Sequence, residues 1–353
     1  MRGLKFSHNA RLGRLVDDGY RELEKATSRD DLFAIIDTFE SFPGPKTFQP
    51  TLGLGSLVSG ALLILLSLIL YNSLHSPLDF GSYQHSASVC IGIVGSFAVL
   101  AGICILIGQA NNIPMLSKVL IRKMILIEMK LHPLDDYRYL ILERISADFG
   151  DYQREGHSRE LVVAQDNSLK PSSDPCQSFS YYELAYAEKR VEVNYNTERA
   201  RDECKEVIHH FKRYSLIFDF QGLRGLTIRT HAAGILSDRR VWLDTRDSVF
   251  DQLFRLSGDS LLECETLLKN DLLGLFIELE SFLTRPSLEF SEKGQLCLSF
   301  DDDLLKPAIE EDLSLPAALR IKLEHGTATS RFIEVLEWIE RLQKQVNTIT
   351  PSA

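Results

Sequence analysis

The feature that most constrains this chain is residues 51–108, which contain no Lys or Arg and a single carboxylate, Asp79. Two uncharged apolar runs, residues 52–71 and 87–108, lie within this stretch. At about 1.5 Å per helical residue, each run can cross the roughly 30 Å hydrocarbon core of a bilayer. Helices that are apolar on every face are hard to bury in a soluble domain of this size. The sequence therefore predicts two transmembrane helices.

The two predicted helices are joined by residues 72–86, where Pro77, Asp79 and Gly81 are turn formers. A connection this short predicts an antiparallel hairpin. Small residues at four-residue spacing would let the two backbones approach closely in lipid. The candidates for this packing role are Ser56, Gly60, Ser88, Gly92 and Ser96. The alternative is that Gly and Ser are simply common in membrane helices.

The charges that flank the hairpin predict its orientation. The connection carries no Lys or Arg, whereas basic residues lie on both flanks, among them Arg11, Lys46 and Lys118. The positive-inside rule then places both termini on the cytosolic side of the membrane. The first twenty residues contain no apolar core of a signal peptide, so we expect both spans to be retained.

The remaining pattern is mostly helical. Ser28 and Asp31 form a capping-box pattern at the start of a helix within residues 1–41. Pro114 can begin a helix to about residue 131, interpreted either as an interfacial helix with basic side chains on lipid phosphates or as a stalk packed on the soluble domain. Further helices are expected at residues 134–149, 179–218, 244–256 and 260–283. Short strands are expected at residues 161–164, 226–229 and 241–243, and a hairpin at 288–300.

These expectations define a mainly α membrane protein. An N-terminal helical segment (1–50) precedes the transmembrane hairpin (51–108), and a mostly helical, cytosol-facing domain with a small β element follows (109–353, with a polar irregular segment at 150–177).

The last helix has apolar residues at alternating three- and four-residue spacing, which is typical of a coiled-coil seam. The seam residues are Phe332, Val335, Ile339, Leu342, Val346 and Ile349. One interpretation is self-association or partner binding through this seam. The other is a helix that docks on its own domain.

Sequence motifs that indicate catalysis or the binding of a cofactor or metal are scarce. The sequence has no Gly-rich dinucleotide or phosphate loop and no Gly-x-Ser-x-Gly nucleophile elbow. Cys204, His209 and His210 fit no zinc spacing, and Cys204 is expected to be a core cysteine. The run at residues 301–303 lacks the alternation of a calcium loop and is expected to cap a helix. We therefore expect no enzyme, no cofactor and no metal or catalytic residues.

Charge and cysteine usage limit the partners and the compartment. Residues 1–50 carry eight basic and eight acidic side chains, so the net charge of −10 lies almost entirely after Gly108. An acidic domain argues against nucleic-acid binding, which needs clustered Lys and Arg. The six cysteines include no Cys-x-x-Cys pair, which favours a reducing compartment for the domain.

The layout of a modest N-terminal segment, two closely spaced apolar lobes at residues 52–71 and 87–108, and a cytosol-facing domain resembles the inclusion membrane (Inc) proteins of chlamydiae. The resemblance covers about the first 130 residues and rests on architecture, so it carries over no functional residue. It implies type III secretion and insertion into the membrane of the pathogen vacuole. It also implies that both termini lie in the host cytosol, where they bind host proteins.

The leading hypothesis is therefore a secreted membrane scaffold whose residues 109–353 bind a host protein, with the lipid bilayer as its other partner. A bacterial inner-membrane protein with a cytoplasmic sensor or effector domain is the first alternative. A membrane-anchored enzyme with dispersed catalytic residues is the second.

Overall fold

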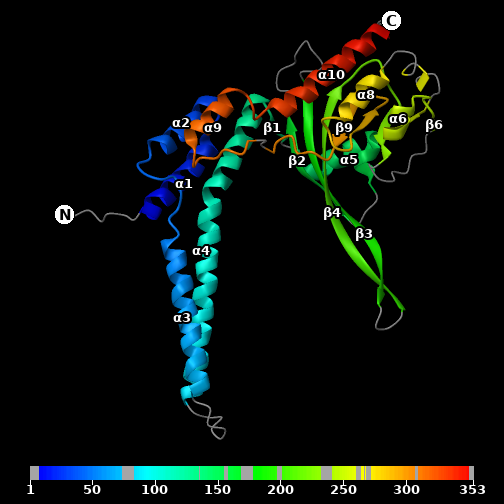
Figure 1. Cartoon of the computed structure of the whole chain (residues 1–353). Helices are drawn as coiled ribbons and strands as arrows, with labels where there is room; N and C mark the ends of the chain where they lie inside the picture. The colour runs from blue at the N-terminus through cyan, green and yellow to red at the C-terminus, as the bar shows by residue number, and fades with distance from the viewer. Residues whose placement is uncertain are drawn as a thin grey trace. The chain divides into compact units, whose positions relative to one another are not determined.

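The computed structural model describes residues 8–73, 83–134, 136–154, 158–167, 178–196, 201–231, 241–259, 264–265, 267, 272–306 and 309–349. The chain divides into two compact units (Figure 1). Met1–Ile127 and Lys306–Ala328 form the first, which we call the helical unit, and Glu128–Leu305 and Thr329–Ala353 form the second, the sheet unit.

The helical unit packs α1 (His8–Lys25), α2 (Arg29–Ser41) and α9 (Pro316–Glu324) around the C-terminal part of α4 (Tyr83–Glu128). The capping box predicted at the start of α2 is confirmed, because Ser28 accepts from the Asp31 backbone and the Asp31 side chain accepts from the Ser28 backbone. Helix α9 joins α2 through Arg29, which donates to the Leu323 carbonyl at 3.0 Å, and through the Arg320–Asp37 ion pair.

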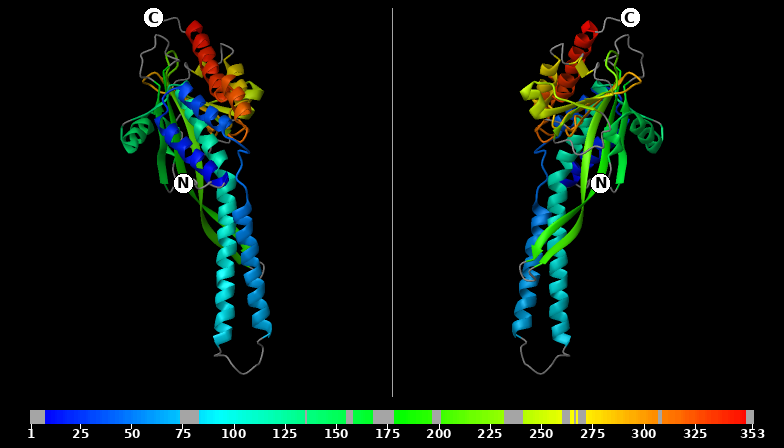
Figure 2. Two further views of the ribbon diagram at one scale, coloured as in Figure 1. Left: turned by 90° about the vertical axis from the view of Figure 1, so that its left-hand side faces the viewer. Right: turned by 90° about the vertical axis from the view of Figure 1, so that its right-hand side faces the viewer.

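Helices α3 (Thr51–Ser73) and α4 form the predicted pair, and both are long and apolar enough to cross a membrane. They run side by side in the views of Figures 1 and 2. Only 11% of the most apolar window of each helix is buried within the chain, whereas a core helix of a soluble protein is mostly buried. The outer faces expose large apolar side chains, among them Leu52, Val58, Leu62, Ile69, Phe97 and Ile107. The turn formers Pro77, Asp79 and Gly81 lie outside the described residues.

Helix α4 does not begin anew at Pro114 but continues through it. A proline inside a helix removes one backbone hydrogen bond, and the helix persists here because its following turns bury Ile113, Leu116 and Leu120 in the helical unit. Ser117 also stabilises this part of the helix. Its hydroxyl donates to the Ile113 carbonyl at 2.7 Å and accepts from the Leu313 backbone N–H at 2.9 Å.

The sheet unit contradicts the expected mostly helical domain, because its centre is a nine-stranded antiparallel sheet in the order β1-β2-β3-β4-β9-β8-β5-β7-β6 (Figure 1). The largest error concerns residues 179–218, which were expected to be one helix and instead form two paired strands, β3 and β4. The strands are β1 (His132–Pro133), β2 (Ser158–Asp166), β3 (Phe179–Asn196), β4 (Arg201–Asp219), β5 (Leu226–Thr230), β6 (Val241–Leu243), β7 (Phe254–Gly258), β8 (Ser287–Phe290) and β9 (Gln295–Phe300).

Other local predictions fare better. The structure confirms the strands at 226–229 and 241–243 and the hairpin at 288–300, and the expected helix at 134–149 is α5 (Arg138–Asp148). The helix expected to begin at residue 244 is α6 (Ser248–Leu253), and Asp247 caps it. The expected continuation of that helix to residue 256 is wrong, because β7 begins at Phe254. Most of residues 260–271 lie outside the described residues, and α8 covers Leu273–Glu280.

The two faces of the sheet differ in polarity. On the face of Phe179 and Tyr181, Phe332 of α10 (Ser330–Ile349) lies 5.5 and 6.0 Å from those rings. On the opposite face, α5 and the 3₁₀ turn η1 (Gly150–Gln153) pack against Tyr182 and its neighbours. Residues alternate across a strand, so each strand contributes to both faces. The α10 face is mostly apolar and holds the buried Glu183, which pairs with Lys212, whereas the η1 face carries several buried charges.

Candidate functional site

The structure places four of the five small residues predicted to pack the membrane hairpin at the α3–α4 contact. Ser56 donates to the Ala98 carbonyl at 2.7 Å, and a Cβ atom on Gly60 would lie 2.6 Å from the Gly95 carbonyl oxygen. Ser88 is buried, and Gly92 lies against Ser67. Ser96 is the exception, because it is exposed and its hydroxyl donates to the Gly92 carbonyl in its own helix at 2.9 Å.

The contact follows a seven-residue repeat that the four-residue pattern did not reveal. Gly53 lies against Gly102, Gly60 against Gly95, and Ser67 donates to the Ser88 carbonyl at 2.7 Å. A seven-residue repeat keeps one seam facing the partner helix along its whole length. Counting in steps of seven as well as four would have found Gly53, Ser67, Gly95 and Gly102.

The predicted coiled-coil seam of the last helix faces the sheet unit itself. Five of its residues are almost fully buried there, namely Phe332, Val335, Ile339, Leu342 and Val346, while the side chain of Ile349 lies outside the described part of the chain. Trp338 on the same helix donates its indole N–H to the Leu275 carbonyl of α8 at 2.9 Å. The structure thus shows the docked arrangement of this helix.

The most prominent surface element of the sheet unit is the outer part of the β3–β4 hairpin, which we call the arm (residues 188–196 and 201–213). Strand β2 pairs with β3 only as far as Ala187, and β9 pairs with β4 only from Tyr214 onward. Among the described residues, the arm strands pair only with each other. At about 3.3 Å per residue, residues 188–196 extend about 30 Å beyond the sheet, and Figure 1 shows this ribbon projecting from the sheet.

The two faces of the arm are chemically different. On one face Arg190 binds Glu188 at 2.6 Å and lies 5.4 Å from the centre of the Phe211 ring. On the other face Val191 and Ile208 are 59% and 44% exposed. An exposed apolar face between two open backbone edges is the geometry through which proteins add a strand from a partner.

The arm also corrects the expectation for Cys204, which is exposed on β4 and is not a core cysteine. The helical stripe that suggested burial does not exist in a strand, where Cys204 shares a face with Ile208. His209 and His210 are adjacent on the strand and point to opposite faces. No cluster of His, Cys, Asp or Glu among the described residues could hold a metal ion.

A second set of functional-looking residues is the buried charge network on the η1 face. Arg213 is central: its Nε donates to Asp151 at 2.9 Å and its Nη1 to Asp301 at 2.7 Å. Arg154 also binds Asp151 and donates to the Tyr186 hydroxyl at 3.1 Å. The three side chains Arg154, Asp151 and Arg213 are at most 6% exposed. The sequence offered no signal for this network, because Asp151 and Arg213 are 62 residues apart and Arg213 and Asp301 are 88 residues apart.

Charge pairing dominates the ionisation of this network. Burial by itself would raise the pKa of Asp151, but the charges and hydrogen bonds of Arg213 and Arg154 outweigh it and hold that pKa well below its usual range. Burial would lower the pKa of Arg213, and Asp151 and Asp301 raise it instead. Asp151 and Arg213 are therefore both charged at neutral pH.

A further carboxylate on the η1 face of the sheet, that of Glu289, binds the backbone of η1. Glu289 accepts from the Gly150 and Asp151 backbone N–H groups at 2.6 and 2.8 Å and pairs with Arg229 at 3.2 Å. Carboxylates that accept from two backbone donors fix a turn firmly. The network thus fastens η1 to the sheet, which is a structural role.

The carboxylates of residues 301–303 are all engaged within the protein. Asp301 pairs with Arg213 and Arg285, Asp302 accepts from the Thr284 backbone at 2.6 Å and pairs with Arg331 at 3.0 Å. Asp303 accepts from the Tyr181 hydroxyl at 3.0 Å and from the Leu305 backbone at 2.9 Å. The expected capping role is thus seen for Asp303 at a turn rather than at a helix.

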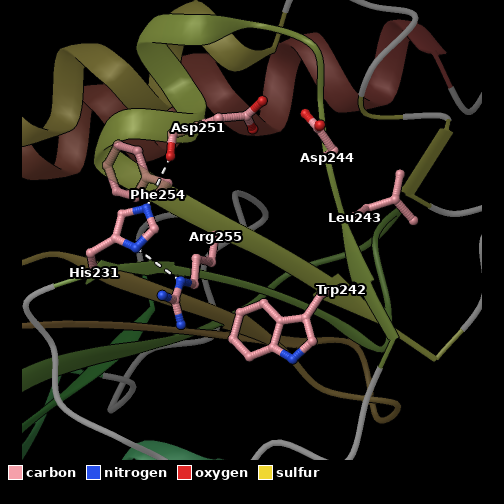
Figure 3. A pocket seen from close by; sticks show the side chains of 7 residues that line it. All are labelled: His231, Trp242, Leu243, Asp244, Asp251, Phe254 and Arg255. Atoms are coloured by element: carbon pink, nitrogen blue, oxygen red, sulfur yellow. Dashed lines mark hydrogen bonds between the residues drawn. The ribbon is translucent and has the colours of Figure 1, made fainter.

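A hollow of about 590 Å³ lies beside β6 and α6 (Figure 3). Arg255 donates to His231 Nδ1 at 2.8 Å and lies 5.4 Å from the centre of the Trp242 ring. His231 Nε2 must then carry its proton and donate to the Asp251 carbonyl at 2.9 Å. Asp251 accepts from the Thr245 hydroxyl at 2.7 Å. These polar groups bind one another, and the hollow has no pair of groups arranged as nucleophile and base among its described residues.

The fold and the exposed apolar helices together define a class: a protein with two helices long and apolar enough to cross a membrane, a small helical unit and an antiparallel sheet domain. Searches of protein-family models, curated proteins and solved structures find no match to this chain.

Proposed function

We propose that this protein is a membrane-anchored scaffold whose sheet unit binds a partner protein through the β3–β4 arm. The arm carries the proposal because it combines two backbone edges that pair with no further strand among the described residues with exposed Val191 and Ile208. An isolated two-stranded ribbon is only marginally stable in water. Strand addition by a partner satisfies one open edge and sets the partner's apolar side chains beside Val191 and Ile208 on the same face.

The side chains around this apolar face suggest the chemistry of the partner. Lys189 and Glu206 flank Val191 and Ile208 and pair with each other at 2.7 Å. A face with an apolar centre and one charge of each sign fits an extended segment that alternates apolar and polar residues. The proposed partner is therefore a protein with an accessible strand of this alternating type.

The test compares three forms of the full chain by proximity labelling in cells. In the first, residues 188–209 are replaced by Asn-Gly, a two-residue turn that can join the paired residues Ala187 and His210. The second carries Val191→Lys and Ile208→Lys. The control carries Val249→Lys and Ile333→Lys, which change exposed apolar residues on α6 and α10.

The proposal expects the same set of neighbours to be lost from both arm variants and kept by the control. The purified neighbour should then bind the wild-type chain at least tenfold more tightly than it binds the arm variants. Equal neighbour sets for all three forms would contradict the proposal.

The membrane that holds the protein is a separate part of the proposal. The bilobed hairpin resembles that of Inc proteins, which favours the vacuole membrane of an intracellular pathogen, with the sheet unit in the host cytosol. Imaging of tagged protein during infection should then show a ring around the vacuole. Signal confined to the bacterial envelope would exclude this location and favour the inner-membrane alternative with a cytoplasmic sensor or effector domain.

A further inference from the structure

The N-terminal half of α1 is fastened to the point where the chain enters the membrane helix α3. Asn9 makes two hydrogen bonds to Gln49, donating to its carbonyl at 2.7 Å and accepting from its backbone N–H at 2.8 Å. His8 lies 3.2 Å from the Thr47 carbonyl and 5.8 Å from the Phe42 ring. Gln49 is two residues before Thr51, a chain length of at most about 7 Å. The start of α1 therefore lies close to the lipid-facing surface.

Basic side chains gather at this end. Arg11 lies two residues after Asn9, about 3 Å further along the helix axis, and it is exposed. Lys46 lies three residues before Gln49 on the adjoining connection, within about 11 Å of it. The first residues of α3 expose Leu52 and Leu54 to the surroundings. Cationic side chains beside lipid-facing leucines match the boundary between phosphate headgroups and hydrocarbon.

The charged side chains of α1 are also distributed unevenly, with basic residues in its first half and acidic residues in its second half. Its first nine residues contain two arginines, Arg11 and Arg14, and no carboxylate. Its second half carries the four acidic residues Asp17, Asp18, Glu22 and Glu24. The nearest carboxylate on the connection side is Glu40, two residues before Phe42. The positive end of α1 thus lies at the membrane and the negative end lies away from it.

We propose that the N-terminal part of α1 and the connection before α3 form a binding surface for the headgroups of anionic phospholipids. In this surface Arg11 and Lys46 contact lipid phosphates. The planar Arg11 guanidinium can bind two oxygens of one phosphate, and Lys46 supplies a separate, flexible point charge for another headgroup. The surface selects the lipids around the hairpin and does not depend on the arm or its partner.

The experiment reconstitutes the full chain into nanodiscs of equal parts phosphatidylcholine and phosphatidylserine. Native mass spectrometry then counts the lipids that remain bound to the released protein. The test variant carries Arg11→Glu and Lys46→Glu. The matched control carries Arg21→Glu and Lys25→Glu, which change the net charge equally at the far end of α1, where these side chains are 70% and 71% exposed.

The wild type and the control should both retain several-fold more phosphatidylserine than phosphatidylcholine, and the test variant should retain the two lipids equally. A milder variant, Arg11→Gln with Lys46→Gln, should fall between these values, and circular dichroism should show the same helix content in all forms. Undiminished enrichment in the test variant would overturn the proposal. Equal loss in the control would assign the preference to net charge and would also overturn it.

A competition arm separates the lipid from a free anion. Millimolar inorganic phosphate, compared with potassium chloride at the same ionic strength, should leave the enrichment unchanged. Specific loss of phosphatidylserine in phosphate would make the surface a site for free phosphate and would contradict a lipid ligand.

Discussion

Arg213 shows how a single residue can fix the fold of the sheet unit. It joins Asp151 of η1, Asp301 beyond β9 and the Ser287 hydroxyl of β8 through one guanidinium, at 2.9, 2.7 and 3.0 Å. Five donors in a planar fork make Arg suited to such a junction. Its charge balances two carboxylates that would otherwise be buried with fewer partners.

We expect Arg213→Met to lower the free energy of unfolding by about 3–5 kcal/mol, since removing one member of a buried ion pair leaves charge uncompensated. The change Lys189→Met removes a pair with Glu206 in which the side chains are 49% and 62% exposed, and should cost less than about 1 kcal/mol. Urea titration of the full chain in detergent, followed by circular dichroism, measures both. Similar losses for the two variants would contradict a central role of Arg213.

The pH dependence of stability follows from the depressed pKa of Asp151. A carboxyl with a lower pKa in the folded chain binds fewer protons when folded, so its contribution is complete above its unfolded pKa of about 3.9 and is lost as pH falls below that value. Asp302 adds to the same trend: burial raises its pKa, and the Thr284 backbone and Arg331 lower it by more. Stability should therefore decline from about pH 4 downward.

Asp151→Asn should reduce the steepness of this decline between pH 5 and 3, besides lowering stability at neutral pH. Asp219→Asn, a change at the exposed end of β4, should keep the wild-type slope. Thermal unfolding midpoints at several pH values measure the slopes. An unchanged slope in Asp151→Asn would show that other carboxyls control acid unfolding.

At the scale of elements, the glycines of the hairpin give a clean test of close packing. A Cβ atom on Gly60 would lie 2.6 Å from the Gly95 carbonyl oxygen, whereas one on Gly55 meets nothing within 4 Å. Gly60→Leu should therefore force α3 and α4 apart at a cost of about 1–3 kcal/mol, and Gly55→Leu should have little effect. Both variants add the same leucine side chain to α3, so they differ only in its position.

The measurement is the oxidation yield of a Cys pair introduced at Ser67 and Ser88, which adjoin across the hairpin, with Cys90 and Cys104 changed to Ser. The yield should fall in Gly60→Leu and persist in Gly55→Leu. Equal yields would show that the helices do not depend on this close approach.

The elements that the sequence predicted correctly are those with a strong local signal, such as a uniformly apolar run, a helix cap or a short apolar strand between turn residues. The uniformly apolar runs and the capped helix α2 follow directly from composition and from Ser28 and Asp31. Strand β3 was predicted to be part of a helix because it is buried on both faces at its start, where Tyr181 and Tyr182 are both buried. Such a strand lacks simple alternation, and its spacing can imitate a helix. Its many Tyr and Val residues were the overlooked β signal.

At the scale of the whole molecule, the chain order does not follow the two units. Residues 306–328 return to the helical unit after the sheet has formed, and α9 pairs with α2 through Arg320 and Asp37, 283 residues apart. No local pattern encodes such a return, because it depends on contacts between distant segments. The expected boundary at residue 108 likewise lies inside the continuous helix α4. The arm could not be predicted from the sequence either, because it is defined by where β2 and β9 stop pairing with β3 and β4.

The predicted topology places both units on one side of the membrane. Single cysteines introduced at Asp30 of α2 and Gln345 of α10, in a chain without its native cysteines, should react together with an impermeant maleimide added to one side of sealed vesicles. A cysteine at Ser76, in the connection between the spans, should react only from the other side. Reaction of all three positions from one side would exclude a two-span hairpin.

Helix α4 has a mechanical consequence for the helical unit. One unbroken helix of 46 residues holds the lipid-facing Phe97 and the buried Leu116, Leu120 and Met124. Membrane helices adjust their tilt to the thickness of the surrounding bilayer. A rigid helix acts as a lever, so a change of tilt at Phe97 turns the residues around which α1, α2 and α9 are built. If α3 and α4 cross a bilayer, we expect the orientation of the helical unit to change with bilayer thickness.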